Sequence, residues 1–400
     1  MPGTPTRAPH HGGRRRPGPR TAPPGVPRPR YALRRAVALA ALLAVAGAVA
    51  LLSSAGLRPS AGRVRSGGSG AAGGSPSGDR APRREASAAG RARSGPSAGR
   101  GGQRRRAASR AHAAGPPYSV GMLDETLLEP ATAATATGRS ASGEPVRALA
   151  VSIRYPAAPA GGPFPLIVFS QGYDTSVSAY AGLLDAWTRA GFTVASPTYP
   201  HTDPAGPGEL DESDIVNHPG DLRFVIRSLA RQAGDPASPL RRLVNAREIA
   251  VAGQSDGGDV SLAVAADSCC LDSAVRAAVI MSGAELPSFG GAYYADGSVP
   301  LLVTQGSADT INVPPCSAQL YDQAPQPKYY VDLLAQSHLP PYVEPGPARD
   351  YVAKASIAFL RAYLQGRAGA LRALVAAGGA PGVATITSAA QLAGAGTACP

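Results

Sequence analysis

The chain has neither a Cys-x-x-Cys nor a His-x-x-x-His spacing among its four cysteines and six histidines. Closely spaced ligands of these kinds are typical of zinc sites, so the sequence argues against a zinc centre. Residues 197–219 collect several carboxylates and two histidines, but not at the spacing of a calcium-binding loop. We therefore expect no metal and no cofactor, and we interpret this segment as a solvated acidic loop near the mouth of a site.

Basic residues are scarce in the larger part of the chain. Residues 1–115 contain 22 arginines and only two acidic residues, Asp79 and Glu85, so their net charge is +20. The whole chain has a formal net charge of +12, and residues 116–400 therefore carry −8. An acidic domain without a basic stripe argues against binding of nucleic acid. The arginine-rich segments are interpreted as solvated spacers.

Apolar residues are too few in residues 1–35 and 57–115 to form a core, and we expect both segments to be disordered. Between them lies an uncharged apolar run, residues 36–56. At about 1.5 Å per residue its roughly 21 residues can cross a hydrocarbon core of about 30 Å. Arg34 and Arg35 precede the run and favour a cytoplasmic N-terminus. We expect a single-pass membrane anchor with the folded domain outside the cell, or alternatively a cleaved signal peptide and secretion.

The cysteines are few, but their even number permits disulfides in an exported chain. Adjacent cysteines rarely pair, so Cys269 and Cys270 are each expected to have a distant partner or to remain free. A bridge between Cys316 and Cys399 would tie the C-terminal tail to the preceding domain.

No internal repeat is present, and apolar runs alternate with helical patterns over residues 116–366. This alternation predicts an α/β domain with a mostly parallel central sheet and helices on both faces. Strands are expected at residues 149–155, 166–169, 192–196, 249–252, 277–281, 301–304 and 329–333, and helices at 180–189, 221–232, 259–266 and 348–364. Residues 367–400 form an Ala- and Gly-rich tail that predicts no particular structure.

A Gly-x-Ser-x-Gly pentapeptide, residues 253–257, follows the apolar run 249–252. This is the sequence pattern of a sharp strand-to-helix turn that holds a nucleophilic serine clear of the backbone. Gly253 and Gly257 are expected where neighbouring backbone leaves no room for a side chain. The pattern predicts Ser255 as a nucleophile, against the alternative of an ordinary turn serine.

A serine nucleophile needs a base and an acid, and His338 is the one histidine that follows Ser255. His338 and Asp309 each follow a strand-like segment, in the chain order serine, acid, histidine. We expect Asp309 to orient His338, and His338 to take the proton of Ser255. A turn aspartate and a surface histidine are the alternatives.

Negative charge on the substrate oxygen requires backbone N–H donors. One is expected from Asp256, the residue after the nucleophile, and the second from Tyr173, which follows a buried strand and Gly172. The rings of Tyr173, Phe289 and Tyr293 are candidates to line a substrate pocket, although such rings serve equally well as loop anchors.

Residues 169–173, the pentapeptide, residues 306–309 and residues 337–338 together resemble secreted bacterial esterases of the α/β-hydrolase superfamily. The most similar groups are the dienelactone-hydrolase-like and platelet-activating-factor-acetylhydrolase-like enzymes and the bacterial cutinases, or polyester hydrolases. The resemblance covers about residues 117–366. Gln171 and Gln254 depart from it, because many relatives have His at these positions.

The resemblance and the residue order together predict an extracytoplasmic serine esterase that forms an acyl-enzyme and acts, as a monomer, on a small or polymeric ester. The same machinery would suit a polyester or amide hydrolase. An inactive hydrolase fold that serves as a binding module is the alternative outside the enzymes.

Overall fold

The computed structural model describes residues 117–157, 161–392 and 399, and all of these belong to one compact unit. The predicted leader, the apolar run 36–56 and the linker lie outside the described residues. Within the part that is described, no helix is both long and apolar enough to cross a membrane.

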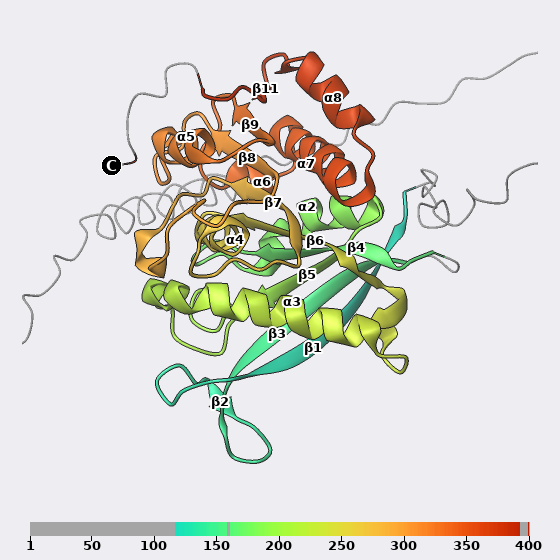
Figure 1. The fold of residues 1–400 in the computed structure, drawn as a ribbon, viewed down its shortest axis with the longest axis vertical. Helices are drawn as coiled ribbons and strands as arrows, with labels where there is room; N and C mark the ends of the chain where they lie inside the picture. The colour runs from blue at the N-terminus through green and yellow to red at the C-terminus, as the bar shows by residue number, and fades with distance from the viewer. Residues whose placement is uncertain (1–116, 158–160, 393–398, 400) are drawn as a thin grey trace, which may run out of the picture. The chain divides into compact units, whose positions relative to one another are not determined.

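A mixed, mostly parallel sheet runs through the molecule in the order β1-β3-β5-β4-β6-β7-β8-β9-β11-β10, with β2 paired to β3 (Figure 1). The strands from β5 to β9 are parallel to their neighbours in this order, and the pairs at both margins are antiparallel. The strands are β1 (Ser119–Pro130), β2 (Gly138–Arg139), β3 (Pro145–Ala157), β4 (Phe164–Ser170), β5 (Thr193–Thr198), β6 (Val244–Gln254), β7 (Val275–Met281), β8 (Leu301–Gly306), β9 (Lys328–Leu333), β10 (Gly379–Ala380) and β11 (Ala384–Thr387).

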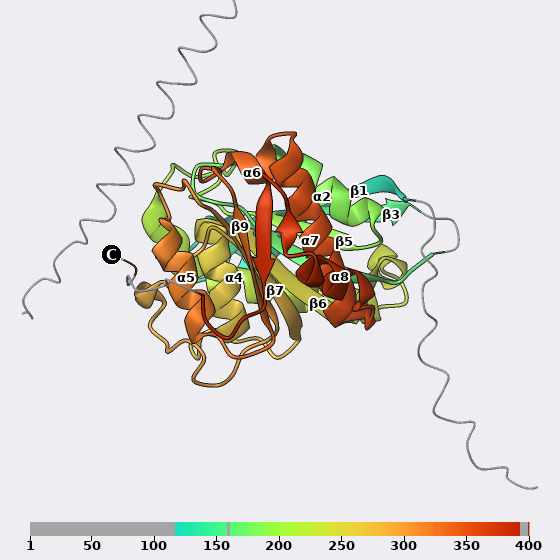
Figure 2. The ribbon, with the colours of Figure 1, turned by 90° about the horizontal axis from the view of Figure 1, so that it is seen from above.

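Helices cover both faces of the sheet (Figure 2). On one face α3, α4 and α5 pack against one buried hydrophobic cluster, and on the other α2, α7 and α8 pack against a second. The helices are α2 (Ala181–Arg189), α3 (His218–Gly234), α4 (Asp256–Ala266), α5 (Pro314–Gln323), α6 (Pro340–Val343), α7 (Pro347–Gln365) and α8 (Gly369–Ala376); η1 (Val177–Tyr180), η2 (Glu212–Asn217), η3 (Pro239–Arg242) and η4 (Pro287–Phe289) are short 3₁₀ segments.

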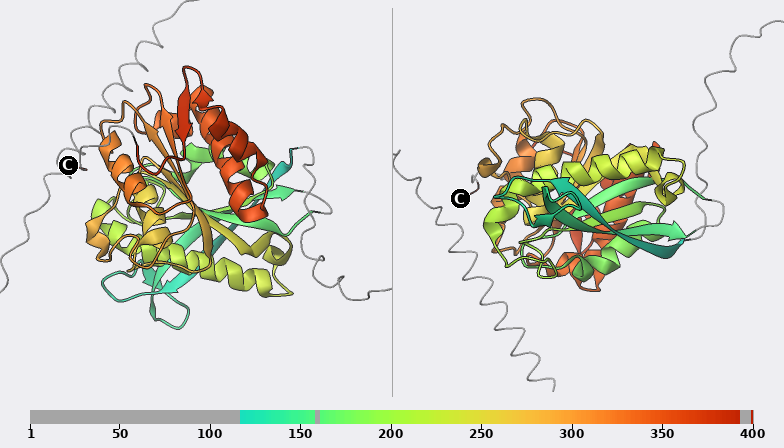
Figure 3. Two further views of the ribbon diagram at one scale, coloured as in Figure 1. Left: turned by 45° about the horizontal axis from the view of Figure 1, so that its top comes forward. Right: turned by 90° about the horizontal axis from the view of Figure 1, so that it is seen from below.

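The predicted α/β class and mostly parallel sheet are confirmed, and each predicted strand and helix coincides with an observed element to within a few residues. The central strands are buried on both faces, which is why each reads as an apolar run rather than as an alternating pattern. The long β1–β3 ribbon at one margin of the sheet was not predicted in full (Figure 3).

The fold continues beyond residue 366, where the sequence indicated only a tail. Helix α8 packs on the cluster that holds α7, and β11 pairs antiparallel with β9. Leu334 N, just after β9, donates to Val383 O at 2.9 Å. The C-terminal segment therefore braces the strand that leads to His338.

The sheet reverses its winding direction between β4 and β6. The chain passes from β4 to β5 on one side and then crosses to β6 on the other, and Ser170 at the end of β4 pairs with Gly253 near the end of β6. In open α/β sheets, ligands bind at the carboxyl edge at such a switch point. The loops after β4 and β6 therefore lie side by side where a binding site is expected.

Two disulfides join the four cysteines. Cys316 in α5 is bonded to Cys399, as the sequence suggested. Cys269 and Cys270 are bonded to each other, so the expectation that neither would pair with its neighbour is wrong. These two residues lie in the tight turn after α4, where Cys269 N donates to Asp267 Oδ1 at 3.0 Å and Cys270 N to Asp267 O.

The two disulfides should differ strongly in their contribution to stability. The Cys316–Cys399 bond closes a loop with a sequence separation of 83, whereas the Cys269–Cys270 bond closes a separation of 1. Because a crosslink restricts the unfolded chain more when the loop is long, the paired change Cys316→Ala and Cys399→Ala should lower the free energy of unfolding by about 2–4 kcal/mol. The matched pair Cys269→Ala and Cys270→Ala should cost much less, as measured by urea unfolding. Equal losses for the two pairs would contradict this.

Candidate active site

Ser255 forms the joint between β6 and α4 and has an unusual backbone conformation, with φ 55° and ψ −126°. A positive φ is strained for a residue with a side chain and persists only where its surroundings enforce it. Here Ser255 N donates to Met281 O on β7 at 2.9 Å, and Asp259 N donates to Ser255 O at 3.0 Å. The sharp strand-to-helix turn expected from the pentapeptide is therefore present.

Both glycines of the pentapeptide are required by space. A Cβ on Gly253 would overlap the carbonyl of Gly257, and a Cβ on Gly257 would overlap the carbonyl of Ser170. The structural role expected of the two glycines is thus confirmed. The missing side chains allow α4 to begin directly against β4.

Asp309 and His338 lie in the loops after the neighbouring strands β8 and β9, and His338 Nδ1 is 2.7 Å from Asp309 Oδ2. The carboxylate is held on its other sides as well. Its Oδ2 accepts from Gln305 Nε2 at 3.0 Å, and its Oδ1 accepts from Ile311 N at 2.9 Å and Asn312 N at 3.1 Å. Asp309 is only 3 % exposed, so these protein donors, rather than water, satisfy and hold its carboxylate.

This pairing determines which imidazole nitrogen can act as a base. A carboxylate can only accept, so the proton of a neutral His338 resides on Nδ1, and Nε2 presents its lone pair. Gln254 Nε2 donates to His338 O at 3.2 Å, which brings the His338 loop to the residue that precedes Ser255. Ser255 and His338 are each 8 % exposed. No hydrogen bond joins the Ser255 hydroxyl to the imidazole among the described residues.

The loop after β4 adjoins the turn at Ser255. A Cβ on Gly172 would lie 2.7 Å from Gln254 Oε1 and 3.1 Å from Ser255 Cβ, so only glycine fits there. The next residue, Tyr173, has no acceptor for its N–H among the described residues. Asp256 is the first residue of α4, and the N–H groups of a first helical turn point out of the helix end. The two N–H groups predicted from the sequence thus belong to adjoining segments beside Ser255.

The aromatic residues predicted to line a pocket have different surroundings. Tyr173 is partly buried, and burial together with the negative charge of Glu212 raises the pKa of its hydroxyl. Phe289 and Tyr293 pack against the hydrophobic cluster under α4, and Tyr293 Oη accepts from Leu286 N at 2.9 Å. Their contacts are those of loop anchors, and a pocket-lining role for these two residues stays a prediction.

The segment 197–219 is less solvated than predicted, because several of its polar side chains are buried. Asp203 is 1 % exposed and accepts from Val177 N at 3.2 Å and Ala205 N at 2.8 Å. His218 is 2 % exposed. Among the described residues, no group of three or more His, Cys, Asp or Glu side chains is arranged to hold a metal ion.

His218 belongs to a buried polar network beside β5. Its ring stacks on Tyr199 with centroids 3.9 Å apart, and its Nε2 is 3.3 Å from Asp214 Oδ2. Arg147 pairs with Asp214 and, at 2.8 Å, with Asp221. Burial lowers the pKa of His218 below its usual value. Burial would raise the pKa of Asp214, but hydrogen bonds from His218 and Arg147 outweigh this and hold it well below its usual range.

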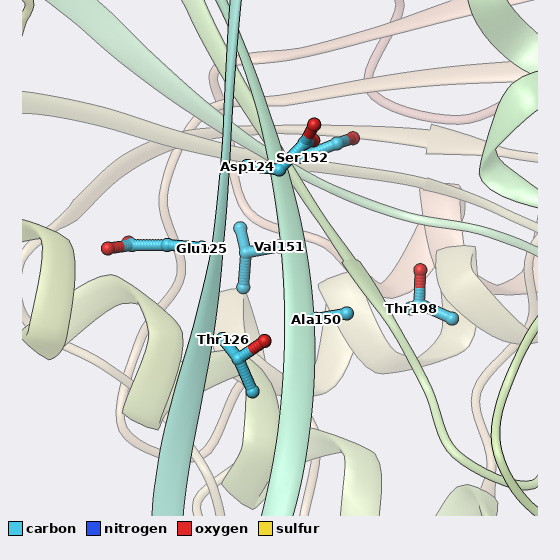
Figure 4. Close-up of a pocket in the computed structure, with 7 residues that line it drawn as sticks. All are labelled: Asp124, Glu125, Thr126, Ala150, Val151, Ser152 and Thr198. Carbon is cyan, nitrogen blue, oxygen red and sulfur yellow. The ribbon is translucent and has the colours of Figure 1, made fainter.

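A separate pocket of about 330 Å³ lies on β1, β3 and β5 (Figure 4). It is lined by Asp124, Glu125, Thr126, Ala150, Val151, Ser152 and Thr198. None of these residues was predicted for the site at Ser255, and β4 separates β5 from β6 in the sheet.

The sequence did not reveal the roles of four residues that hold the site together. Gln305 and Asn312 fix Asp309, while Tyr180 and Gln254 link the loops around Ser255. Their positions near the motifs were visible in the sequence, but a polar residue near a motif does not reveal its partner.

A scan against models of protein families finds no match to the chain, and a search of curated proteins finds no similar sequence. The function must therefore be argued from the geometry of the site.

The buried state of His218 should make the stability of the fold depend on pH. Because folding lowers the pKa of His218, the unfolded chain binds more protons than the folded one as the pH falls through about 6.5, and stability is lost in that window. The change His218→Phe keeps a ring over Tyr199 and removes this difference. Its free energy of unfolding should fall less steeply between about pH 7 and pH 5, by up to about 1.4 kcal/mol per pH unit. Urea unfolding at several pH values measures both slopes, and parallel slopes would show that His218 does not titrate in this way.

Proposed function

We propose that the chain is a serine hydrolase that cleaves carboxylic esters, with Ser255 as nucleophile, His338 as general base and acid, and Asp309 as the residue that orients His338. The observation that carries the proposal is the 2.7 Å contact between Asp309 and His338, which leaves Nε2 as the free base in a loop tied to the Ser255 turn. An aspartate and a histidine on neighbouring loops have few other reasons to be buried and paired beside a strained serine.

In the proposed reaction, Ser255 Oγ attacks the ester carbonyl carbon while His338 Nε2 takes its proton. The carbonyl oxygen becomes negatively charged and accepts hydrogen bonds from Tyr173 N–H and Asp256 N–H. The C–O bond to the alcohol then breaks, and His338 returns the proton to the leaving alcohol. Water repeats the same steps on the acyl-enzyme and releases the acid, so the scheme requires no cofactor.

We assign the domain, on the same grounds, to the α/β-hydrolase fold. Three features support this assignment: the strand-to-helix turn at the nucleophile, the chain order serine, aspartate, histidine, and an N–H donor from the loop after an earlier strand. A panel of esters, amides and insoluble polyesters would separate the carboxylic esterase from an amide or polyester hydrolase with the same three residues.

We propose further that the apolar run 36–56 carries the enzyme out of the cytoplasm, either as a membrane anchor or as a cleaved signal. The two disulfides support this location, because such bonds persist in oxidising compartments.

The change Ser255→Ala should abolish turnover of a short-chain nitrophenyl ester, lowering kcat on the order of 10⁴- to 10⁶-fold, because no other group replaces the attacking oxygen. The free energy of unfolding should change by less than about 1 kcal/mol, since the hydroxyl has no hydrogen-bond partner among the described residues. Steady-state kinetics and urea unfolding measure the two quantities.

A matched control is Ser261→Ala in α4. The Ser261 hydroxyl is buried and has no hydrogen-bond partner in the described structure, so this change removes a hydroxyl from the same helix and should leave activity close to wild type. Activity that survived Ser255→Ala would refute the assignment of the nucleophile.

A further inference from the structure

The two glutamines at which the chain departs from the family pattern have different surroundings. Gln171 is buried, and neither atom of its side-chain amide has a hydrogen-bond partner among the described residues. Gln254, which precedes Ser255, is equally buried but uses both ends of its amide. Its Nε2 donates to His338 O at 3.2 Å, and its Oε1 accepts from Tyr180 Oη at 2.7 Å.

The directions of these hydrogen bonds are fixed by chemistry. A backbone carbonyl can only accept, so the NH₂ end of Gln254 faces His338 and the oxygen end faces Tyr180. The hydroxyl of Tyr180 must then donate to Gln254, which leaves its lone pairs to accept from Gly172 N at 3.3 Å. The result is a single ordered chain of hydrogen bonds from Gly172 through Tyr180 and Gln254 to His338.

The chain of hydrogen bonds connects three segments that are remote in the sequence. Gly172 immediately precedes Tyr173, whose N–H is assigned to the substrate oxygen. Gln254 immediately precedes Ser255, and the far end is the backbone of His338. The loop after β4, the turn at Ser255 and the His338 loop are thus joined through two side chains that do not themselves react.

The two side chains of this connection are shielded from solvent. Tyr180 is fully buried, and its ring packs on Phe169 with centroids 4.9 Å apart, in the cluster that also contains Trp187. In such surroundings hydrogen bonds are stronger, and a broken one leaves a polar group that water cannot reach. This connection therefore constrains the relative placement of the three loops.

We propose that Gln254 and Tyr180 are positioning residues that set the relative placement of the oxyanion loop, Ser255 and His338. This inference rests on the proposed hydrolase function. It assigns a role to Gln254 that only a side chain with one acceptor and one donor on the same planar group can fulfil. An ionised carboxylate at this position would face the His338 carbonyl with a second acceptor, whereas a protonated carboxyl could accept from Tyr180 and donate to His338.

The first test compares Tyr180→Phe, Gln254→Met and the double variant with wild type. Each single change should lower kcat about 10- to 100-fold through misplacement of the reacting groups, with KM changed less than about threefold. The kcat of the double variant should be at most about threefold lower than that of the less active single variant, because either change alone already breaks the connection. Effects that multiply, or that fall on KM, would overturn the proposal.

The matched control is Tyr351→Phe. Tyr351 lies in the same hydrophobic cluster and is buried, but its hydroxyl has no hydrogen-bond partner among the described residues. Its loss should leave kcat within about twofold of wild type. If Tyr180→Phe behaved like Tyr351→Phe, the proposal would be wrong.

The second test uses Gln254→Glu and a pH profile, a readout that a merely structural residue would not move. The introduced carboxyl is buried, so its pKa should lie above the usual value for glutamate. Below that pKa the connection is preserved, and kcat relative to wild type should be near one. Above it the ratio should fall by about tenfold or more, while Gln254→Met gives a ratio that does not vary with pH. A pH-independent ratio for Gln254→Glu would contradict the proposal.

The proposed function and the positioning roles can be overturned separately. If wild type neither hydrolyses esters nor reacts with a fluorophosphonate, the proposed function falls, and with it the positioning roles. If wild type reacts and the Tyr180 and Gln254 variants match wild type, the hydrolase stands and only the positioning roles fall.

Discussion

The positive φ of Ser255 is the constraint on which the remainder of the site depends. It can exist only because β6 ends against α4 with no side chain at Gly253 or Gly257, and because Met281 O on the next strand fixes the turn through Ser255 N. Every residue of α4 is buried, so the helix that follows the turn has no freedom to relax it. The strain is therefore borne by the packing of the sheet, and the serine is held at its carboxyl edge.

The histidine side of the site depends on the far margin of the sheet. His338 follows β9, and β9 is flanked on its outer side by β11 from the C-terminal segment. Asp309 is fixed by Gln305, Ile311 and Asn312, so the imidazole is oriented by a carboxylate that is itself unable to turn. The connection through Tyr180 and Gln254 then joins this margin to the centre of the sheet.

Much of this arrangement could be predicted from the sequence. The central strands are fully buried apolar runs, and the pentapeptide and the loops bearing Asp309 and His338 each follow one of them. The fold class, the order of the strands along the chain and the edge of the sheet that carries the candidate site could therefore be predicted. The C-terminal helix and strand were not, because α8 has 8 residues and β11 has 4, and so short a stretch gives too little hydrophobic periodicity to distinguish it from a tail. The Cys269–Cys270 bond was missed because it depends on one local turn, and the role of Gln254 because its partners lie 74 and 84 residues away.

The most direct test of the central claim is a crystal structure of the protein after reaction with a phosphonate ester analogue, whose phosphonyl oxygen stands in for the oxyanion. We expect phosphorus bonded to Ser255 Oγ and the phosphonyl oxygen about 2.7–3.1 Å from the N atoms of Tyr173 and Asp256. His338 Nε2 should lie within hydrogen-bond reach of Ser255 Oγ or of the leaving-group position. Attachment at any other residue, or a phosphonyl oxygen directed away from both N–H groups, would contradict it.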